Sequence, residues 1–233
     1  MDERYLAEID YNLDRGSTFS YQCNACTRCC HHNIIAVGPY EILRLARHFG
    51  ITTTDFIAQH TEAGGTALRR REEEDEACVF LTARGSCGVH RDRPLVCRIY
   101  PLAHQHDDEG RESFGRLAPD PQTEGVYGNA GTVASFLEQQ GYAPYSDAAA
   151  RYMVVYLRMI EALERLDPAE LARGASRRAD VGATAPGFAA SDWIDIDRTV
   201  AAYCKASGRP MPDTVEATVA VHVEAIEAWI ASL

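Results

Sequence analysis

The sequence has no run of about 18 apolar residues, so it predicts no membrane-spanning helix. Its first sixteen residues, MDERYLAEIDYNLDRG, are acidic and have no apolar core, so we expect no secretion signal and a cytoplasmic location. Basic residues are scarce beside acidic ones, 23 against 34, which gives a net charge of −11. Nucleic acids and anionic membranes are bound by basic surfaces, and we therefore expect neither as a partner.

Several familiar motifs are also missing. The sequence contains no internal repeat, no P-loop, and no G-x-G-x-x-G, G-x-S-x-G or H-E-x-x-H pattern. Eight cysteines in 233 residues are too few for a disulfide scaffold. The overall composition, 46% apolar and 24% charged, is that of an ordinary globular protein with a substantial core.

The cysteines are distributed very unevenly. The stretch FSYQCNACTRCCHH, residues 19–32, holds four of them, three more follow within the first hundred residues, and only Cys204 lies beyond. In a reducing compartment, such clustering indicates metal binding or catalysis rather than disulfide bonds. The clustered set is Cys23, Cys26, Cys29, Cys30, Cys78, Cys87 and Cys97.

Cys23, Cys26 and Cys29 follow the spacing C-x₂-C-x₂-C, in which a turn aims successive thiolates at one point. Cys30 points away from Cys29 because adjacent side chains diverge, so it either serves a second metal or packs in the core. Three thiolates from one loop and a fourth from a distant segment are typical of ferredoxins more than of zinc ribbons. Seven thiolates exceed the four that one site needs, which leaves open two sites or one site with spare thiols.

The motifs CNACTRCC and CVFL…CGVHRDRPLVCRIYPL together resemble the CxxCxxCC family of zinc- or iron-chelating proteins, also called YkgJ-type cysteine-cluster proteins. The resemblance covers roughly residues 20–140 and implies that all seven clustered cysteines are metal ligands. Family members often carry a further cysteine in a C-P-G stretch, where this sequence reads LAPDPQTEG. Asp120 in that stretch either replaces a ligand or fills a loop. Flagellin lysine-N-methylases, relatives with this cluster, are associated with an iron–sulfur centre, so the resemblance favours iron–sulfur over zinc.

Residues beside the cysteines allow two interpretations. His31, His32 and His90 are either zinc ligands or surface residues that form hydrogen bonds. Arg93 and Arg98 flank Cys97, and we predict them as cofactor-binding cations that offset the negative charge of a thiolate centre; the alternative is surface salt bridging.

Three further features favour ordinary roles. Tyr100 is expected to pack rather than to relay protons, and Cys204 to be a small buried hydrophobic residue. His104 and His106 in HQHDDEG would bind a metal if a strand presented both rings on one face, but a solvated acidic loop is the preferred interpretation.

The predicted fold is mainly α with a small β-hairpin: a compact cysteine-rich metal-binding domain over residues 1–145 and a helical C-terminal region over 146–233. Helical periodicity and end signals predict the helices, a Gly-containing turn predicts the hairpin at 78–90, and prolines limit 92–104 to a loop with one helical turn. We expect an irregular connection at 110–129 and a flexible linker at 172–191. The predicted helices cover 38–50, 52–60, 131–141, 147–166, 192–208 and 212–233.

Three functions remain open at this level. The favoured one is a metal-binding cysteine-cluster protein with a 4Fe–4S-type centre used for redox chemistry or substrate binding. The second is an enzyme that modifies a protein or peptide, related to flagellin lysine-N-methylase. The third is an interaction module with structural zinc. We expect a protein or peptide partner, whose identity the sequence does not indicate.

Overall fold

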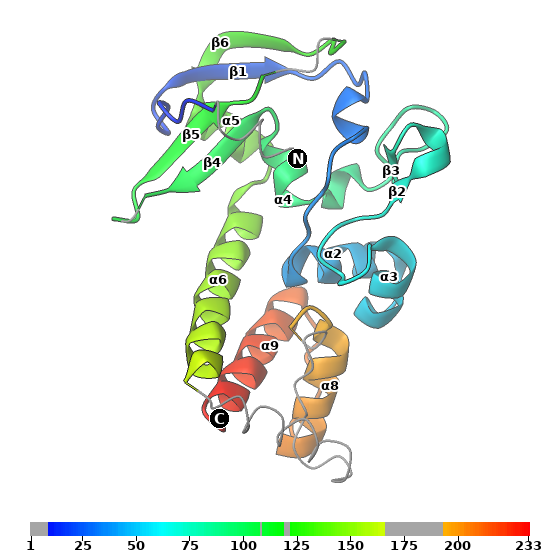
Figure 1. The fold of residues 1–233 in the computed structure, drawn as a ribbon, viewed down its shortest axis with the longest axis vertical. Coiled ribbons are helices and arrows are strands. Elements are labelled where there is room, and N and C mark those ends of the chain that lie inside the picture. Colours follow the sequence, from blue (N-terminus) through cyan, green and yellow to red (C-terminus); the bar gives the residue numbers. More distant parts are fainter. Residues whose placement is uncertain (1–8, 108, 119–121, 166–192) are drawn as a thin grey trace. The chain divides into compact units, whose positions relative to one another are not determined.

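The computed structural model describes residues 9–107, 109–118, 122–165 and 193–233 (Figure 1). The chain divides into two compact units, 1–37 with 67–146 and 38–66 with 147–233. The predicted domain boundary between residues 145 and 146 stays a prediction. Asp120 and the predicted linker at 172–191 lie outside the described residues.

The first unit contains more β-structure than the predicted single hairpin. Its described strands form three two-stranded antiparallel sheets, β1 with β6, β2 with β3, and β4 with β5 (Figure 1). The fold class is therefore mixed rather than mainly α. The strands are β1 (Thr18–Gln22), β2 (Arg70–Arg71), β3 (Ala77–Cys78), β4 (Leu102–His106), β5 (Glu112–Arg116) and β6 (Val126–Thr132). The short helices are η1 (Arg28–Cys30), η2 (Glu72–Glu74), η3 (His90–Asp92), α4 (Leu95–Ile99) and α5 (Val133–Gln139).

A hydrophobic cluster joins β1, β4, β5, α4 and α5. Phe19 is fully buried and meets Phe136 edge-on at 5.0 Å between ring centroids, an arrangement that adds about 0.5–1.5 kcal/mol to the burial of the rings. The cluster fixes α4, the helical turn that carries Cys97. Its buried members are Phe19, Ile99, Leu102, Phe114, Val133, Phe136, Leu137 and Tyr142.

The irregular connection predicted at 110–129 is wrong, because β5 and the start of β6 lie within it. Strand β5 pairs with β4 on one side, and Leu13 exchanges backbone hydrogen bonds with Phe114, at 3.0 and 2.8 Å. A Cβ on Gly115 would lie 2.3 Å from Ile9 Cγ2, so only glycine lets the N-terminal segment approach this closely. The strand is thus stabilised by partners distant in sequence, which composition does not reveal.

The segment 78–90, predicted as a hairpin, forms a tight turn closed by a single β-bridge and has no pair of regular strands. Leu81 and Cys87 form an isolated antiparallel bridge, and the turn closes with Thr82 N–H donating to Ser86 O at 2.8 Å. Gly85 at φ +67° completes the reversal, a conformation natural to glycine. The helical turn expected between Pro94 and Pro101 is confirmed as α4.

The second unit is helical among its described residues. Helix α2 begins at Pro39 and ends before Gly50, whose φ of +66° stops it, and α3 is capped by Thr52 Oγ1, which accepts from Asp55 N–H at 3.1 Å. The predicted helices are confirmed here, although α6 starts earlier than expected. Its helices are α2 (Pro39–Phe49), α3 (Thr53–His60), α6 (Ala143–Glu164), whose first residues belong to the first unit, α8 (Ile196–Ser207) and α9 (Val215–Ile230).

Helix packing and charged caps hold the second unit together. Helices α8 and α9 pack side by side (Figure 1), and α2 and α3 pack against α8. Buried Asp195 caps α8 and accepts the hydroxyls of Thr53 at 2.6 Å and Thr54 at 2.7 Å. Arg47 forms a two-pronged ion pair with Asp197 at 2.5 and 2.9 Å. These contacts tie the first turns of α3 and α8 together.

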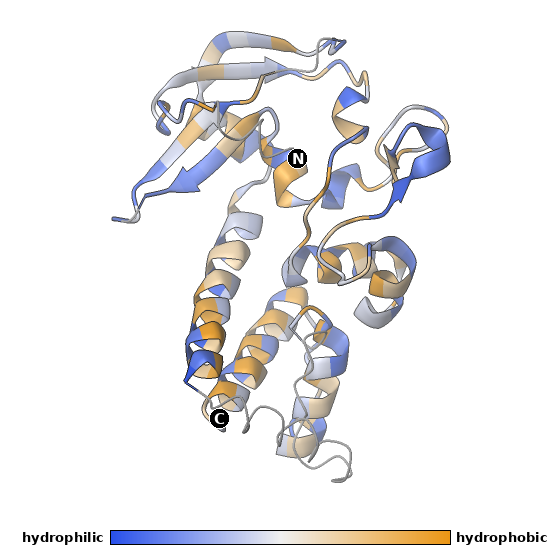
Figure 2. Ribbon diagram, viewed as in Figure 1, coloured by the Kyte–Doolittle hydropathy of each residue, from blue (hydrophilic) through white to orange (hydrophobic). Residues whose placement is uncertain are grey.

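Hydropathy differs sharply between elements. Figure 2 shows the segment around β2 and η2 as hydrophilic, while α9 carries many hydrophobic residues. None of the described helices is both long enough and apolar enough to cross a lipid bilayer.

Candidate metal centre

The seven clustered cysteines come from five short pieces of the first unit, and all are free thiols. Cys23 and Cys26 lie in the loop after β1, Cys29 and Cys30 form the end of η1, and Cys78 ends β3. Cys87 lies in the tight turn and Cys97 lies on α4. Cys23 is exposed and the other six are partly buried.

Four of these thiols are close enough to influence one another in every pairing. Burial raises the pKa of Cys78, Cys87 and Cys97, and negative charge on the neighbouring sulfurs raises it further. Each of the three is affected by Cys29, and the three also affect one another. The structure therefore places Cys29 of the C-x₂-C-x₂-C loop near the three cysteines of residues 78–97, and the arrangement of the ligands stays a prediction.

Cys29 and Cys30 form a hydrogen-bonded pair at the edge of this set. The Cys30 thiol donates to Cys29, which lowers the pKa of Cys29 to about 7 and raises that of Cys30. Negative charge on Cys78 and Cys97 also raises the pKa of Cys30. The lowered pKa of Cys29 favours the thiolate form that a metal ligand needs.

Backbone amides support the sulfurs in a repeated way. Cys26, Cys78 and Cys87 each accept a hydrogen bond from the amide two residues further along the chain, and each bond lowers the pKa of its thiol. Cys26 also accepts from Glu124 N–H at 3.4 Å. An N–H donor favours thiolate over thiol, so these loops are built to hold negative sulfur.

The cysteine loop carries backbone strain. Ala25 and Thr27 have φ values of 55° and 64°, a left-handed conformation that is unfavourable for residues with a Cβ and most unusual for β-branched threonine. None of residues 23–33, all of which the structure describes, is buried. Strained residues persist only where other contacts hold them, and they concentrate at functional sites.

The two predicted cofactor-binding arginines differ in position. Arg93 interacts electrostatically with Cys87 and Cys97 and donates to His90 O at 2.7 Å. Arg98 is buried and donates to Gln140 O at 2.8 Å, while its guanidinium lies 3.8 Å from the centre of the Tyr145 ring. Arg93 is therefore the cation near the sulfurs, and Arg98 fastens α4 to the end of α5. Their role as cofactor-binding residues stays a prediction.

Arg71 is a cation at the cluster that the sequence did not indicate. It lies at the end of the run LRRR, which reads as solvated, yet its Nη2 donates to Leu81 O at 2.6 Å. Its charge lowers the pKa of Cys78. Only the pairing of β2 with β3, which sets Arg71 opposite Ala77, brings it there.

The three histidines beside the cysteines have other partners. His31 Nδ1 lies 3.1 Å from Asp75 O, and His32 Nε2 lies 3.2 Å from Asp75 Oδ1. Burial, together with the charges of Arg93 and Arg98, lowers the pKa of His90. These contacts favour the hydrogen-bonding interpretation over metal ligation.

Aromatic side chains border the cluster. Tyr100 packs edge-on against Tyr21 with ring centroids 6.0 Å apart, as its packing role predicts. Burial raises the pKa of Tyr100, and negative charge on Cys29 and Cys26 raises it further. Negative charge on the same sulfurs raises the pKa of Tyr21, so both rings lie near the sulfurs. In the second unit, Cys204 is 2% exposed on α8, which confirms its role as a buried residue.

His104 and His106 lie on strand β4 and not on a solvated loop as preferred from the sequence. Their ligand nitrogens and a carboxylate oxygen of Glu112 are all within 4.8 Å of one another. In the part of the chain that the structure describes, the cysteines form no such three-membered group.

Comparison with known proteins finds a family that matches the segment containing the clustered cysteines. The model of the CxxCxxCC family, described as "Putative zinc- or iron-chelating domain", matches residues 22–116. This segment, which is less than half of the chain, matches the CxxCxxCC domain. The resemblance read from the motifs is thereby confirmed, and the match supports metal binding by this part of the chain. Searches of curated proteins and of solved structures found no match.

The CxxCxxCC domain contains all seven clustered cysteines and ends with β5. Its donor set suits zinc or iron equally, since both accept thiolate ligands. The paired thiols, the donating amides and the nearby Arg71 and Arg93 all fit an inorganic centre that binds negative sulfur.

Proposed function

We propose that the CxxCxxCC domain binds a 4Fe–4S-type centre through Cys29, Cys78, Cys87 and Cys97, and that this centre serves redox chemistry or substrate binding. The match of residues 22–116, which hold all seven clustered cysteines, to a zinc- or iron-chelating family is the observation that carries the proposal, and the mutual influence of these four thiols on their pKa values supports the choice of ligands. Four thiolates are the complete ligand set of such a cluster. Cys23, Cys26 and Cys30 then surround the site as supporting or alternative ligands.

A single ion and a four-iron cluster hold their thiolates at different spacings. Thiolates around one tetrahedral zinc lie about 3.8 Å apart, because each Zn–S bond is about 2.3 Å long. Among the described residues, the cysteines form no close group of three ligand atoms like that of His104, His106 and Glu112. A four-iron cluster is several ångströms wide and holds its cysteines further apart than zinc does.

The surroundings are suited to tuning such a centre. Arg93 acts on Cys87 and Cys97, Arg71 acts on Cys78, and amides donate to three sulfurs. Positive charge and N–H donors near thiolate ligands stabilise the more reduced, more negative state and so raise the reduction potential. Cys23 is the one exposed thiol of the seven, which makes its segment the most accessible approach to the site.

Structural zinc is the second candidate, since the family description names zinc as well as iron. Under that hypothesis the same four thiols close around one ion and the domain acts as an interaction module. The relation to protein- or peptide-modifying methylases stays a prediction, as do the protein or peptide partner and the cytoplasmic location.

Anaerobic purification followed by metal and sulfide analysis tests the proposal. We expect brown protein with iron and acid-labile sulfide in equal amounts, and broad visible absorption that bleaches with dithionite. Cys29→Ser and Cys97→Ser should lose this absorption, whereas Cys204→Ser, which alters a buried thiol outside the cluster, should retain it.

Cys23→Ser sharpens the assignment. This exposed thiol lies outside the four-membered set, so we expect the variant to keep its iron and its visible absorption. Colourless wild-type protein with one zinc per chain would replace the iron–sulfur proposal with the structural-zinc candidate. Loss of the centre in Cys23→Ser with retention in Cys97→Ser would refute the four ligands named here.

A further inference from the structure

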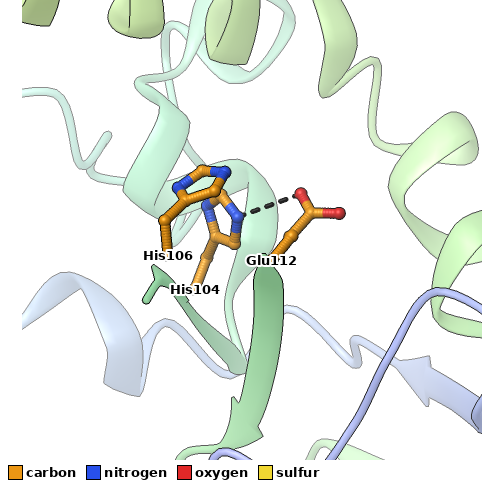
Figure 3. Close-up of side chains that lie close together, drawn as sticks. All are labelled: His104, His106 and Glu112. Atoms are coloured by element: carbon orange, nitrogen blue, oxygen red, sulfur yellow. Dashed lines mark ion pairs between the residues drawn. The ribbon is translucent and has the colours of Figure 1, made fainter. Parts of the chain in front are cut away.

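The β4–β5 hairpin carries a second group of metal-ligand side chains that the cysteine centre does not use. His104 and His106 are two residues apart on β4, so their side chains emerge on the same face. His106 pairs with Glu112 across the sheet, and directly opposed residues of antiparallel strands also share a face. Figure 3 shows the two imidazoles and the carboxylate gathered there.

The ligand atoms of this group lie almost as close together as the ligands of a bound metal ion. His104 Nε2 lies 3.0 Å from Glu112 Oε1, and the two imidazole centroids are 4.7 Å apart at an interplanar angle of 70°. Nitrogen ligands on a tetrahedral zinc ion are about 3.3 Å apart. His106 is exposed, so rotation of its side chain can close the remaining gap.

His104 is held as a metal-binding histidine commonly is. Its ring stacks on Phe114 at 4.8 Å and 19°, and its Nδ1 lies 3.1 Å from the Tyr142 hydroxyl. In the tautomer in which Nδ1 donates to the Tyr142 oxygen, Nε2 carries the lone pair that a metal ion needs. Nε2 is fully buried and faces Glu112 Oε1 at 3.0 Å, so a bound ion would take the place of this contact.

Arg15 would compete with a bound metal ion for the carboxylate of Glu112. Its Nε and Nη2 donate to the two carboxylate oxygens at 2.5 and 2.9 Å, from an N-terminal segment held by the Leu13–Phe114 bridge. A carboxylate has about four lone-pair sites, so it can ligate an ion and still accept from arginine. Arg15 would then orient the ligand while its charge moderates the affinity.

We propose that His104, His106 and Glu112 bind a divalent transition-metal ion of the Zn²⁺ type, in addition to the centre held by cysteines. Two imidazoles and one carboxylate suit Zn²⁺ and Fe²⁺, whereas Mg²⁺ and Ca²⁺ prefer oxygen ligands alone. Three protein ligands leave at least one coordination position for water or an anionic group of a substrate.

Titration of the full-length protein with Co²⁺ and Zn²⁺, after its cysteine centre has been filled, tests this site. We expect one further ion per chain. Bound Co²⁺ should show weak ligand-field bands without the intense sulfur-to-cobalt absorption of a thiolate site. His106→Ala and Glu112→Gln should weaken binding at least about tenfold.

His48→Ala is the matched control, because His48 is also an exposed histidine but lies on α2. It should bind the added ion as wild type does. The proposal is overturned if wild type takes up no further ion, if added Co²⁺ shows sulfur-to-cobalt absorption, or if His106→Ala and His48→Ala bind equally. The thiolate signal reports the cysteine centre separately, so failure of one site is distinguishable from failure of the other.

Discussion

The cysteine segments and the helical unit are stabilised in different ways. Residues 23–33 contain no buried side chain, include one short 3₁₀ turn and adopt left-handed conformations at Ala25 and Thr27. Helices α8 and α9, in contrast, have side-chain caps at Asp195 and Thr214 and bury apolar residues against each other. Hydrophobic burial accounts for the helical unit, but the cysteine loop needs another source of order, and its thiols supply one.

Removal of the bound metal should produce the largest difference in local stability between the two regions. With a chelator, and a reductant or oxidant as the centre requires, we expect residues 23–33 and 77–99 to lose hydrogen-exchange protection by at least about tenfold. Protection in α8 and α9 should change by less than about twofold. Hydrogen exchange with mass spectrometry measures both regions in one sample. Equal loss in both, or in neither, would contradict the distinction.

A matched pair of valines tests the role of burial in the helical unit. Val219 on α9 is 4% exposed and Val154 on α6 is 50% exposed. Val219→Ala removes two buried methyl groups and should lower the free energy of unfolding by about 1–3 kcal/mol. Val154→Ala should change it by less than about 0.5 kcal/mol. Urea titration followed by far-ultraviolet circular dichroism measures both, and similar losses would show that burial does not govern this unit.

A pair of alanines tests the strain in the cysteine loop, with the smallest expected effect. Ala25 has a φ of 55°, whereas Ala83, in the turn before Cys87, is not among the residues with positive φ. Ala25→Gly relieves strain and should leave stability unchanged or raise it by up to about 1 kcal/mol. Ala83→Gly adds freedom to the unfolded chain and should cost about 0.5–1 kcal/mol. Thermal unfolding of the metal-loaded protein compares them, and a larger loss in Ala25→Gly would argue against the strain.

Local sequence signals were sufficient for the helices. Pro39 and Gly50 mark the ends of α2, Thr52 caps α3, and the stripe of α9 includes buried Val219 and Ile226. These features depend on residues within a few positions of one another, where periodicity and capping act. The β-structure was underestimated, because β5 depends on pairing with β4 and with Leu13, contacts that no local pattern encodes.

The sequence by itself determined that sulfur ligands are concentrated in the first hundred residues and which family their spacing resembles, since both are properties of order along the chain. Only the tertiary structure placed Cys29 near enough to Cys78, Cys87 and Cys97 to influence their pKa values, and Arg71 near Cys78. It likewise placed Glu112 beside His104 and His106. Such groupings depend on turn geometry and strand register, which set the distance between residues tens of positions apart and are fixed only when the whole unit packs.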